Sequence, residues 1–348
     1  MRIAFLVSDI DTEQPDYATT RFAVGASDRG HDTFYLDLDG VSYSPDEQLT
    51  ARVRRVPIGN ELPYDSFLER IQRDTDPEAI DVGELDVLML RHEPELTMLE
   101  RPWTPTLGIS IGELAAERGV LVLNDPTGFA RASSKLYLQG FPPEVRPQTL
   151  ITRGEDEARA FIDSLGGRAV VKPLQSGKGR GVFLVRPDED ANVNQMIEAV
   201  KRDGYIVVQE YLTAAGDGDR RLLMMNGEPL RVDGTYAAIF RRAPADDLRA
   251  NISLEGSAEP AEIDDDALRI AAAVKPKLVR DGMFLVGLDI AGDKLIEVNG
   301  TSPGTFTSSQ WVTGVDYAAA VIEAIEKKVA AIAGSRSFDN RELATAVL

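Results

Sequence analysis

The chain has 348 residues, of which 43% are hydrophobic and 27% are charged, and its formal net charge is −19 at pH 7. A chain of this length predicts two or three packed subdomains. The acidic balance argues against a nucleic-acid partner, because phosphate backbones require a basic surface. The absence of cysteine excludes disulfides, thiolate metal sites and a cysteine nucleophile, and two histidines leave little room for a histidine-rich metal site or a serine triad.

The sequence carries no run of apolar residues long enough to cross a membrane. Residues 1–8 are typical of a first strand that ends at Ser8 and Asp9, and they do not have the pattern of a signal peptide. We therefore expect a cytoplasmic protein with no membrane partner.

Residues 1–125 alternate between strand and helix patterns. Strands are predicted at 3–7, 33–38, 85–90 and 120–123, and helices at 17–29 and 109–118. Residues 41–80 are polar and carry no clear pattern. Alternation of this kind favours a Rossmann-like domain, in which helices cover both faces of a parallel sheet.

The pattern changes in residues 126–210, which are predicted to form a small α+β lid. Helices are expected at 129–138, 156–165 and 192–201, and strands at 148–151, 169–172, 182–185 and 205–209. The whole chain is thus assigned to the α/β class with an α+β lid.

Residues 211–333 carry short strands joined by hairpin turns, at Asn226-Gly227 and at Gly292-Asp293. Helices are predicted at 266–281 and 317–332. We expect an antiparallel-sheet catalytic domain here, followed by a tail at 334–348 that either frays or is ordered.

Lys172 is an unusual residue for its position, because it lies inside the apolar strand 169–172. No lysine precedes Lys135 in the chain. A lysine among apolar neighbours either points outward or has a charged partner. Nucleotide phosphates would be such a partner, and an outward-facing lysine is the alternative.

A glycine-rich loop follows this strand, with glycines at 177, 179 and 181 beside Ser176. Glycines let backbone N–H groups approach phosphate oxygens closely. The loop is neither a P-loop nor a dinucleotide fingerprint, and plain turns often have the same composition. We assign Ser176, Gly177, Gly179 and Gly181 to ATP binding.

Gln209, Glu210, Tyr211 and Leu212 follow an apolar strand between the lid and the C-terminal residues. A hinge of this kind can present backbone groups to an adenine while apolar side chains sandwich the ring. The alternative is an ordinary core strand.

Glu297 and Asn299 lie two residues apart on a predicted strand, so their side chains share one face. Asp289 lies on the preceding strand. A three-residue connection would place Asp289 opposite Glu297, whereas a two-residue turn would pair it with Ile296. Oxygen-bearing side chains on one face suit Mg²⁺, which binds carboxylates, phosphate oxygens and water. A solvated polar strand face is the alternative.

Arg221 begins a hydrophobic strand after the acidic, glycine-rich stretch that contains Asp219. It can hold a developing oxyanion, or it can be a paired surface arginine. A second cluster contains Arg241, Arg242, Arg249 and Asn251. In so acidic a chain, local cations between strands suggest capture of a carboxylate-bearing substrate.

Nine stretches, taken in order, resemble prokaryotic glutathione synthetases of the ATP-grasp superfamily. They are 88–91, 123–126, 134–137, 171–174, 218–222, 226–229, 248–251, 286–290 and 297–303. The resemblance runs over roughly residues 1–330. It implies an ATP-grasp fold with ATP between the lid and the C-terminal domain.

The resemblance also implies roles for individual residues. Lys135 and Lys172 would contact ATP phosphates, and residues 210–212 would hold adenine. Asp289, Glu297 and Asn299 would hold two Mg²⁺ ions, for which Mn²⁺ can substitute. Arg221 would stabilise the oxyanion. The remaining assignments are Asp219 for the nucleotide, and Arg91, Arg241, Arg249, Asn251 and Ser302 for the substrate.

The implied reaction joins γ-glutamylcysteine and glycine into glutathione through an acylphosphate, in an enzyme that is often a homotetramer. Two departures from the family stand out. The loop 176–181 is more basic than expected, and segment 93–110 is longer. A ligase for another acid and amine, and a non-catalytic ATP-binding regulator, are therefore the alternatives.

Overall fold

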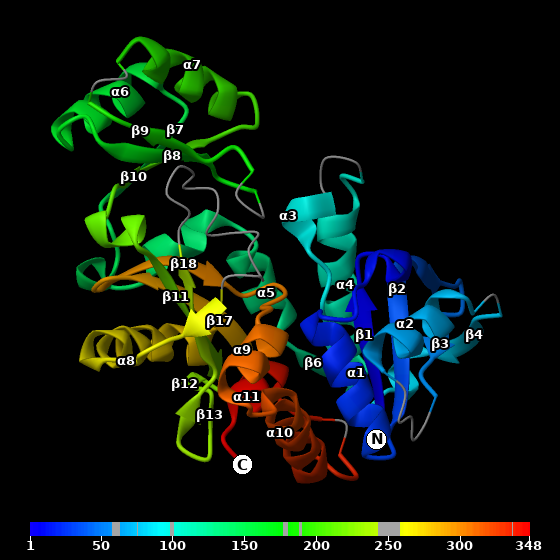
Figure 1. Cartoon of the computed structure of the whole chain (residues 1–348). Coiled ribbons are helices and arrows are strands. Elements are labelled where there is room, and N and C mark those ends of the chain that lie inside the picture. The colour runs from blue at the N-terminus through cyan, green and yellow to red at the C-terminus, as the bar shows by residue number, and fades with distance from the viewer. Residues whose placement is uncertain are drawn as a thin grey trace.

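The computed structural model describes residues 1–57, 63–74, 76–97, 101–176, 180–187, 190–242, 258–335 and 337–348. Three principal sheets organise this part of the chain (Figure 1). Within these ranges, no helix combines the length and the apolar character that a membrane span requires.

The N-terminal sheet has the strand order β4-β3-β2-β1-β5-β6. Its strands are β1 (Arg2–Val7), β2 (Asp32–Tyr43), β3 (Leu49–Arg55), β4 (Glu78–Asp81), β5 (Val87–Leu90) and β6 (Leu121–Leu123). Strands β1, β2, β5 and β6 run parallel, as expected, but β3 and β4 pair antiparallel. These two strands lie in the polar stretch 41–80, for which no strand was predicted. Strands β3 and β4 form one edge of the sheet. One face of these strands remains polar, so they contain few apolar residues and the sequence pattern did not reveal them.

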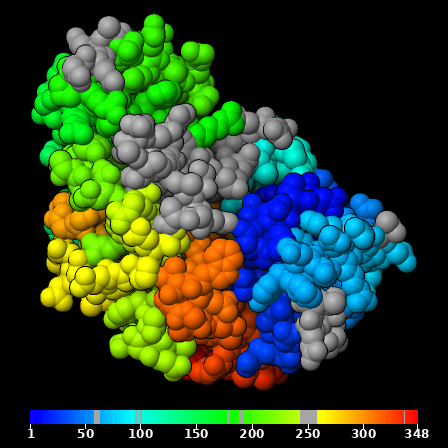
Figure 2. All heavy atoms as spheres, in the orientation of Figure 1, coloured from blue at the N-terminus to red at the C-terminus, as the bar shows by residue number. Residues whose placement is uncertain are grey.

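Helices cover both faces of this sheet. One face packs against α1 (Ala18–Asp28), α2 (Tyr64–Gln72) and α10 (Tyr317–Ala331), and the other packs against α4 (Thr104–Glu117). Phe284 and Leu285 of the C-terminal part belong to the same buried cluster as β1 and α10. The N-terminal and C-terminal parts therefore share one hydrophobic core, and Figure 2 shows them as a continuous body with the lid standing above it.

The lid sheet is antiparallel, with the order β7-β10-β8-β9. Its elements are β7 (Thr149–Thr152), α6 (Glu155–Ser164), β8 (Ala169–Pro173), β9 (Phe183–Val185), α7 (Asp190–Lys201) and β10 (Ile206–Glu210). Helices α6 and α7 lie on the outer face of the sheet (Figure 1). Val171, Ile197 and Val208 belong to a buried cluster whose members all come from the lid.

The helix expected at 129–138 is not continuous. The α-helix α5 (Pro126–Ala132) ends before Ser134, and the 3-10 helix η3 (Lys135–Gly140) follows. Ser134 has an extended backbone (φ −120°, ψ 140°), and its side chain accepts a hydrogen bond from the N–H of Leu136. Serine competes with helical hydrogen bonding in this way, which is why the helical pattern breaks here.

The C-terminal sheet has the order β16-β15-β11-β17-β18. Its strands are β11 (Gly218–Met225), β15 (Ala238–Arg242), β16 (Ala258–Pro260), β17 (Leu285–Ala291) and β18 (Lys294–Asn299), and β12 (Glu228–Pro229) pairs with β11. Helix α8 (Asp265–Arg280) covers the apolar face through Ile270 and Val274. Asn226 and Gly227 both have positive φ, 56° and 78°, as the predicted hairpin turn requires.

The remaining elements are short or peripheral. They are η1 (Ile10–Thr12), η2 (Val82–Glu84), α3 (Pro94–Thr97), η4 (Pro143–Val145), η5 (Thr213–Gly216), β13 (Arg231–Val232), β14 (Thr235–Tyr236), α9 (Phe306–Thr313) and α11 (Asn340–Thr345).

Of the two alternatives for the tail, residues 337–348 show the ordered one. Asn340 at the start of α11 accepts from the N–H of Val122 (2.8 Å) and donates to its carbonyl (3.1 Å), so it satisfies the edge of β6. The buried ammonium of Lys328 donates to the carbonyls of Leu343 (3.0 Å) and Ala346 (2.5 Å). These contacts attach the tail to both the N-terminal sheet and α10.

Candidate ATP and metal site

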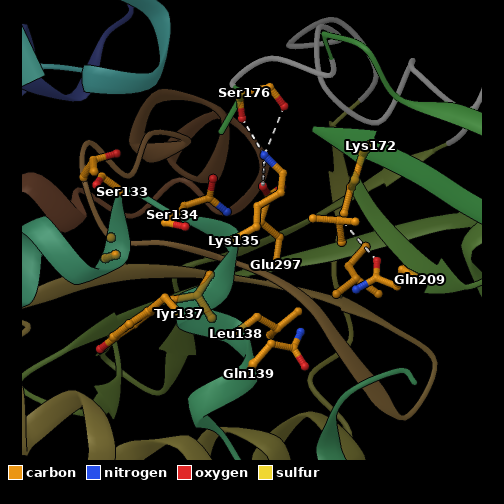
Figure 3. A pocket seen from close by; sticks show the side chains of 17 residues that line it. Ser133, Ser134, Lys135, Tyr137, Leu138, Gln139, Lys172, Ser176, Gln209 and Glu297 are labelled. Carbon is orange, nitrogen blue, oxygen red and sulfur yellow. Dashed lines mark hydrogen bonds and ion pairs between the residues drawn. The ribbon is translucent and has the colours of Figure 1, made fainter. Parts of the chain in front are cut away.

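A pocket of about 590 Å³, including its open mouth, lies between the lid and the C-terminal sheet. Two lysines, three serines, two glutamines and the end of β18 meet there (Figure 3). The lining residues are Ala132, Ser133, Ser134, Lys135, Tyr137, Leu138, Gln139, Lys172, Ser176, Val207, Gln209 and residues 296–301.

Lys135 reaches from η3 toward the loop that follows β8. Its Nζ donates to the carbonyl oxygen of Ser176 (2.6 Å) and to the Ser176 hydroxyl (3.1 Å), and it lies 3.9 Å from Oε1 of Glu297 (Figure 3). The break at Ser134 aims Lys135 across the pocket. The lysine thus links the lid loop to the predicted metal-binding strand.

Lys172 lies on β8 and lines the pocket, so the outward-facing alternative does not describe it. Its Nζ donates to Oε1 of Gln209 on the neighbouring strand (3.0 Å). Burial lowers the pKa of Lys172 to about 8, while the charge of Glu297 acts to raise it. Within the described residues, the buried Nε2 of Gln209 has no hydrogen-bond partner, so the site holds an unused donor.

The glycine-rich loop is described only at its two ends. Ser176 meets Lys135, and Gly181 has a φ of +70° with Pro173 beside its Cα, where a side chain would collide. Gly177 and Gly179 lie outside the described residues. Their assignment to phosphate binding therefore stays a prediction.

The predicted hinge continues from the end of β10. The Oε2 atom of Glu210 accepts from the N–H of Gln148 (3.0 Å), and the Arg168 guanidinium lies 4.2 Å from the centre of the Tyr211 ring. Leu212 begins η5. Gln209 lines the pocket, whereas the other three residues lead away from its lining toward the C-terminal sheet.

The sequence left two registers open for the hairpin β17–β18: a two-residue turn, or a pairing of Asp289 with Glu297. The structure has both features. Ala291 pairs with Lys294 across a two-residue turn, but a β-bulge then shifts the register, and Asp289 pairs with Glu297. The bulge adds one residue, Ile296, to β18. Asp289 and Glu297 are thus brought opposite each other by the bulge, and Nδ2 of Asn299 donates to Oδ2 of Asp289 (3.2 Å).

The side chains of Asp289, Glu297 and Asn299 offer oxygen ligands, which hard divalent cations prefer. Glu297 and Asn299 line the pocket, and the side chain of Glu297 is 38% exposed. Within the described ranges, no three histidine, aspartate or glutamate side chains converge, so two carboxylates and one amide would be the protein's contribution. Mg²⁺ commonly binds through one or two carboxylates plus phosphates and water, and this donor set fits it.

Asp289 also belongs to a row of four charged side chains, Arg241, Asp219, Arg221 and Asp289, which we call the charge row; Arg241 is half-buried and the other three are buried. Arg221 forms a two-contact ion pair with Asp289, and its Nη2 lies 2.8 Å from Oδ2. Arg241 forms a two-contact ion pair with Asp219 and also lies 3.0 Å from Oδ1 of Asp289. Arg221 is therefore a buried, paired residue, not a surface arginine.

The pKa values of the two carboxyl groups in the charge row shift in opposite directions. Burial acts to raise the pKa of Asp289, but Arg221 and Arg241 outweigh it and hold the pKa at about 2. Burial and the charge of Asp289 raise the pKa of Asp219 to about 6. Asp289 is in ion-pair contact with two arginines and Asp219 with one, which explains the difference.

Arg91 lies at the end of β5 and is buried. It donates to the Thr19 hydroxyl (3.2 Å) and to the carbonyl of Pro303 (3.2 Å), so it joins α1 to the loop that contains Ser302. Burial lowers its pKa to about 10. Arg249 and Asn251 lie outside the described residues.

Asn124 was not among the predicted site residues, although it lies in one of the signature stretches. Its side chain donates to the carbonyls of Leu285 (2.9 Å) and Gly300 (2.7 Å) and accepts from the N–H of Leu285 (2.8 Å). It therefore fixes the loop that leaves the pocket at Gly300. An asparagine after a buried strand was the available signal, but its partners are 161 and 176 residues away in sequence.

Two family profiles match the chain. The N-terminal domain of prokaryotic glutathione synthetase matches residues 1–129, and the ATP-grasp domain of prokaryotic glutathione synthetase matches residues 134–313. The glutathione synthetase of Synechococcus elongatus is 31% identical over 338 residues, which cover 94% of this chain and 99% of that protein. That of Bradyrhizobium diazoefficiens is 32% identical over 314 residues, covering 89% and 93%.

Solved structures share the fold at much lower identity. A D-cycloserine synthetase, DcsG, superposes with a TM-score of 0.60 at 14% identity and covers 93% of this chain and 99% of its own. The macrocyclase MdnC of Microcystis aeruginosa gives 0.61 at 12% identity, with coverages of 93% and 99%. The profile matches and the curated relatives place the chain in the prokaryotic glutathione synthetase family, and it carries the ATP-grasp domain of that family.

Proposed function

We propose that this chain is an ATP-dependent C–N ligase that joins γ-glutamylcysteine and glycine to give glutathione, ADP and phosphate. The observation that carries the proposal is the pocket in which Lys135 and Lys172 face Glu297 and Asn299, beside the Arg221–Asp289 pair. Membership in the glutathione synthetase family supports the choice of substrates.

In the proposed first step, a carboxylate oxygen of the dipeptide attacks the γ-phosphorus of ATP, and ADP leaves. Lys135 and Lys172 would hold the phosphate oxygens and balance their charge. The Gln209 amide, which has an unused donor, would contact the nucleotide from the lid side. The product of this step is an acylphosphate.

In the proposed second step, the amine nitrogen of glycine attacks the acyl carbon, phosphate leaves and the nitrogen loses a proton. Arg221 would stabilise the oxyanion of the tetrahedral intermediate. Closure of the lid over the pocket would keep water from the acylphosphate. Arg91 and Ser302 would hold the substrate where the N-terminal sheet meets the loop after β18.

We assign the metal to Asp289, Glu297 and Asn299, with two Mg²⁺ ions or Mn²⁺ in their place. When bound, the cation neutralises charge on the transferring phosphoryl group. The ligands themselves are positioned by the β17–β18 hairpin. Asp289 would exchange part of its contact with the two arginines for contact with the cation.

We further propose that the protein is cytoplasmic and forms a homotetramer, as the family resemblance implies. Light scattering on the purified protein would test the tetramer. A monomer would contradict the oligomer assignment and leave the ligase proposal intact.

The experiment that tests the function is ADP release with Mg²⁺-ATP, γ-glutamylcysteine and a panel of amino acids, with products identified by mass. Turnover restricted to glycine supports a glutathione synthetase. Turnover with another amine, or only with another acid, keeps the ligase chemistry and replaces the substrates. Absence of turnover with every pair favours the non-catalytic regulator.

A further inference from the structure

The charge row is built into the register of three neighbouring strands. Asp219 of β11 pairs directly with Arg241 of β15, and Arg221 of β11 pairs directly with Asp289 of β17. Asp219 and Arg221 are two residues apart, so they share one face of the sheet. Arg241 extends across β11 to reach Asp289 (3.0 Å).

The row continues through Asp289 to β18. Asn299 donates to Asp289, and Glu297 is the direct strand partner of Asp289. Glu297 in turn lies 3.9 Å from Lys135. Charged side chains therefore form a continuous row. It runs from Arg241 of β15, which lies away from the pocket, to Glu297 and Lys135, which line the pocket.

Asp219 is the most enclosed member of the row. Its side chain has 0% exposure, compared with 14% for Arg241 and 4% for Asp289. A fully buried carboxylate is stable only when it is paired, and its partner here is Arg241. Neither Asp219 nor Arg241 lines the pocket.

The two arginines of the charge row would also compete with a divalent cation for the Asp289 carboxylate. Arg221 and Arg241 both contact Asp289, and a divalent ion must share that carboxylate with them. Coulomb interactions between buried groups a few ångströms apart are strong and weakly screened. The contact of Arg241 with Asp219 limits how much of its charge acts on Asp289.

We propose that Asp219 is a positioning residue: by pairing with Arg241 it keeps the charge of that arginine balanced beside Asp289, and so sets the affinity of the pocket for the divalent cation without contacting the cation, nucleotide or substrate. The inference rests on the proposed function only in using the same metal site. It differs from the sequence-based assignment of Asp219 to ATP binding.

The test compares Mn²⁺ binding, followed by electron paramagnetic resonance at pH 8 with a non-hydrolysable ATP analogue present, in the wild type and three variants. Asp219→Asn removes the negative charge, leaves Arg241 unbalanced and is expected to weaken Mn²⁺ binding by roughly tenfold or more. Glu259→Gln is the matched control, because Glu259 of β16 pairs with Arg242 of β15, the neighbour of Arg241 in sequence, in an exposed position. It is expected to leave the affinity unchanged.

The double variant Asp219→Asn/Arg241→Gln removes one charge of each sign and restores the balance. We expect its Mn²⁺ affinity to return to within about threefold of the wild type, and it remains informative if Asp219→Asn alone fails to fold. Kinetics should show a raised KM for Mg²⁺ in Asp219→Asn, with kcat recovered at saturating Mg²⁺. A purely structural role would lower kcat and thermal stability without moving the metal dependence.

Equal Mn²⁺ affinity in the wild type and Asp219→Asn would overturn the proposal, as would a double variant as weak as the single one. Neither result would bear on the ligase activity of the wild type. Conversely, a wild-type protein without ligase turnover would overturn the proposed function and leave the metal-binding comparison intact.

Discussion

The lid and the rest of the molecule, which we call the body, are both built from strands and helices. They differ in that the lid has a hydrophobic core of its own, whereas the two parts of the body share a buried cluster. The lid encloses a cluster of its own, which includes Val171 and Ile197. In the body, β1, α10 and the start of β17 share one cluster, and Asn124 adds three hydrogen bonds between the two sheets. The lid core is therefore separate from the body, whereas the N-terminal and C-terminal parts of the body share a buried cluster.

This difference matters because the pocket takes residues from both regions. Lys172 and Gln209 belong to the lid, whereas Glu297 and Asn299 belong to the body. We propose that the lid contributes nucleotide binding and the body contributes chemistry. The domain boundaries near residues 125, 210 and 333 remain part of this proposal, and the shared core makes the first and third domains a single mechanical unit.

The largest effect is expected from the body. Arg221→Ala removes the donor proposed for the oxyanion and should lower kcat by roughly 100- to 1,000-fold. Affinity for a non-hydrolysable ATP analogue, measured by calorimetry without a divalent cation, should change little because nucleotide contacts are assigned to Lys135, Lys172 and the lid and not to Arg221. Thermal melting controls for the loss of the buried pair. A kcat close to that of the wild type would remove Arg221 from the mechanism.

Shortening one buried side chain in each core should show whether the lid and the body open independently. Ile197→Ala in the lid and Ile322→Ala in the shared core each should cost about 2–5 kcal/mol. Both residues are almost fully buried. Hydrogen exchange is the measurement, because it reports local opening.

In Ile197→Ala, faster exchange is expected in residues 149–210 alone. In Ile322→Ala, both β1 and β17 should lose protection together. Faster exchange of β1 in the lid variant would show that the two cores are coupled after all.

A smaller effect is expected at the tail. Asn340→Ala leaves the N–H and carbonyl of Val122 without their side-chain partners, and it should destabilise the body by about 1–3 kcal/mol. Denaturant unfolding measures this loss. Arg29→Ala, which breaks an exposed pair with Glu326, is the control and should cost less than about 1 kcal/mol. Equal losses in the two variants would mean that the tail adds no specific stability.

The smallest effect is a pH dependence of nucleotide binding. Lys172 has a pKa of about 8 in the ligand-free protein, lowered by burial, and only its protonated form attracts phosphate. Affinity for the ATP analogue should therefore be full below pH 8 and should fall as the pH rises through 8, by at most about tenfold per unit. Lys172→Arg stays charged and should flatten the profile. A wild-type affinity that is constant from pH 7 to pH 9 would contradict this role.

Lys172 and Lys328 show which lysines with structural roles can be recognised from the sequence and which cannot. Lys172 stood out because it interrupts an apolar strand, and it does line the pocket. Lys328 is even less exposed, at 1%, and its pKa is also lowered to about 8 by burial, but it carried no signal among the Glu-Lys spacings of its helix. It binds the carbonyls of the tail, which no local pattern predicts.

The sequence by itself determined the strands and helices with regular periodicity, the hairpin turn at Asn226-Gly227 and the order of the residues that identify the family. These depend on neighbours in the chain. The break of the helix at Ser134, the docking of the tail and the edge strands β3 and β4 depended on partners that the local pattern does not reveal.

Only the tertiary structure decided the register of the β17–β18 hairpin, to which we assign the metal, and the charge row. The bulge at Ile296 sets Asp289 opposite Glu297, and strand order brings Arg241 and Asp219 beside them. Local sequence does not encode which strands become neighbours, because that choice follows from burying the apolar face of the sheet against α8. The buried polar face then requires every charge on it to find a partner.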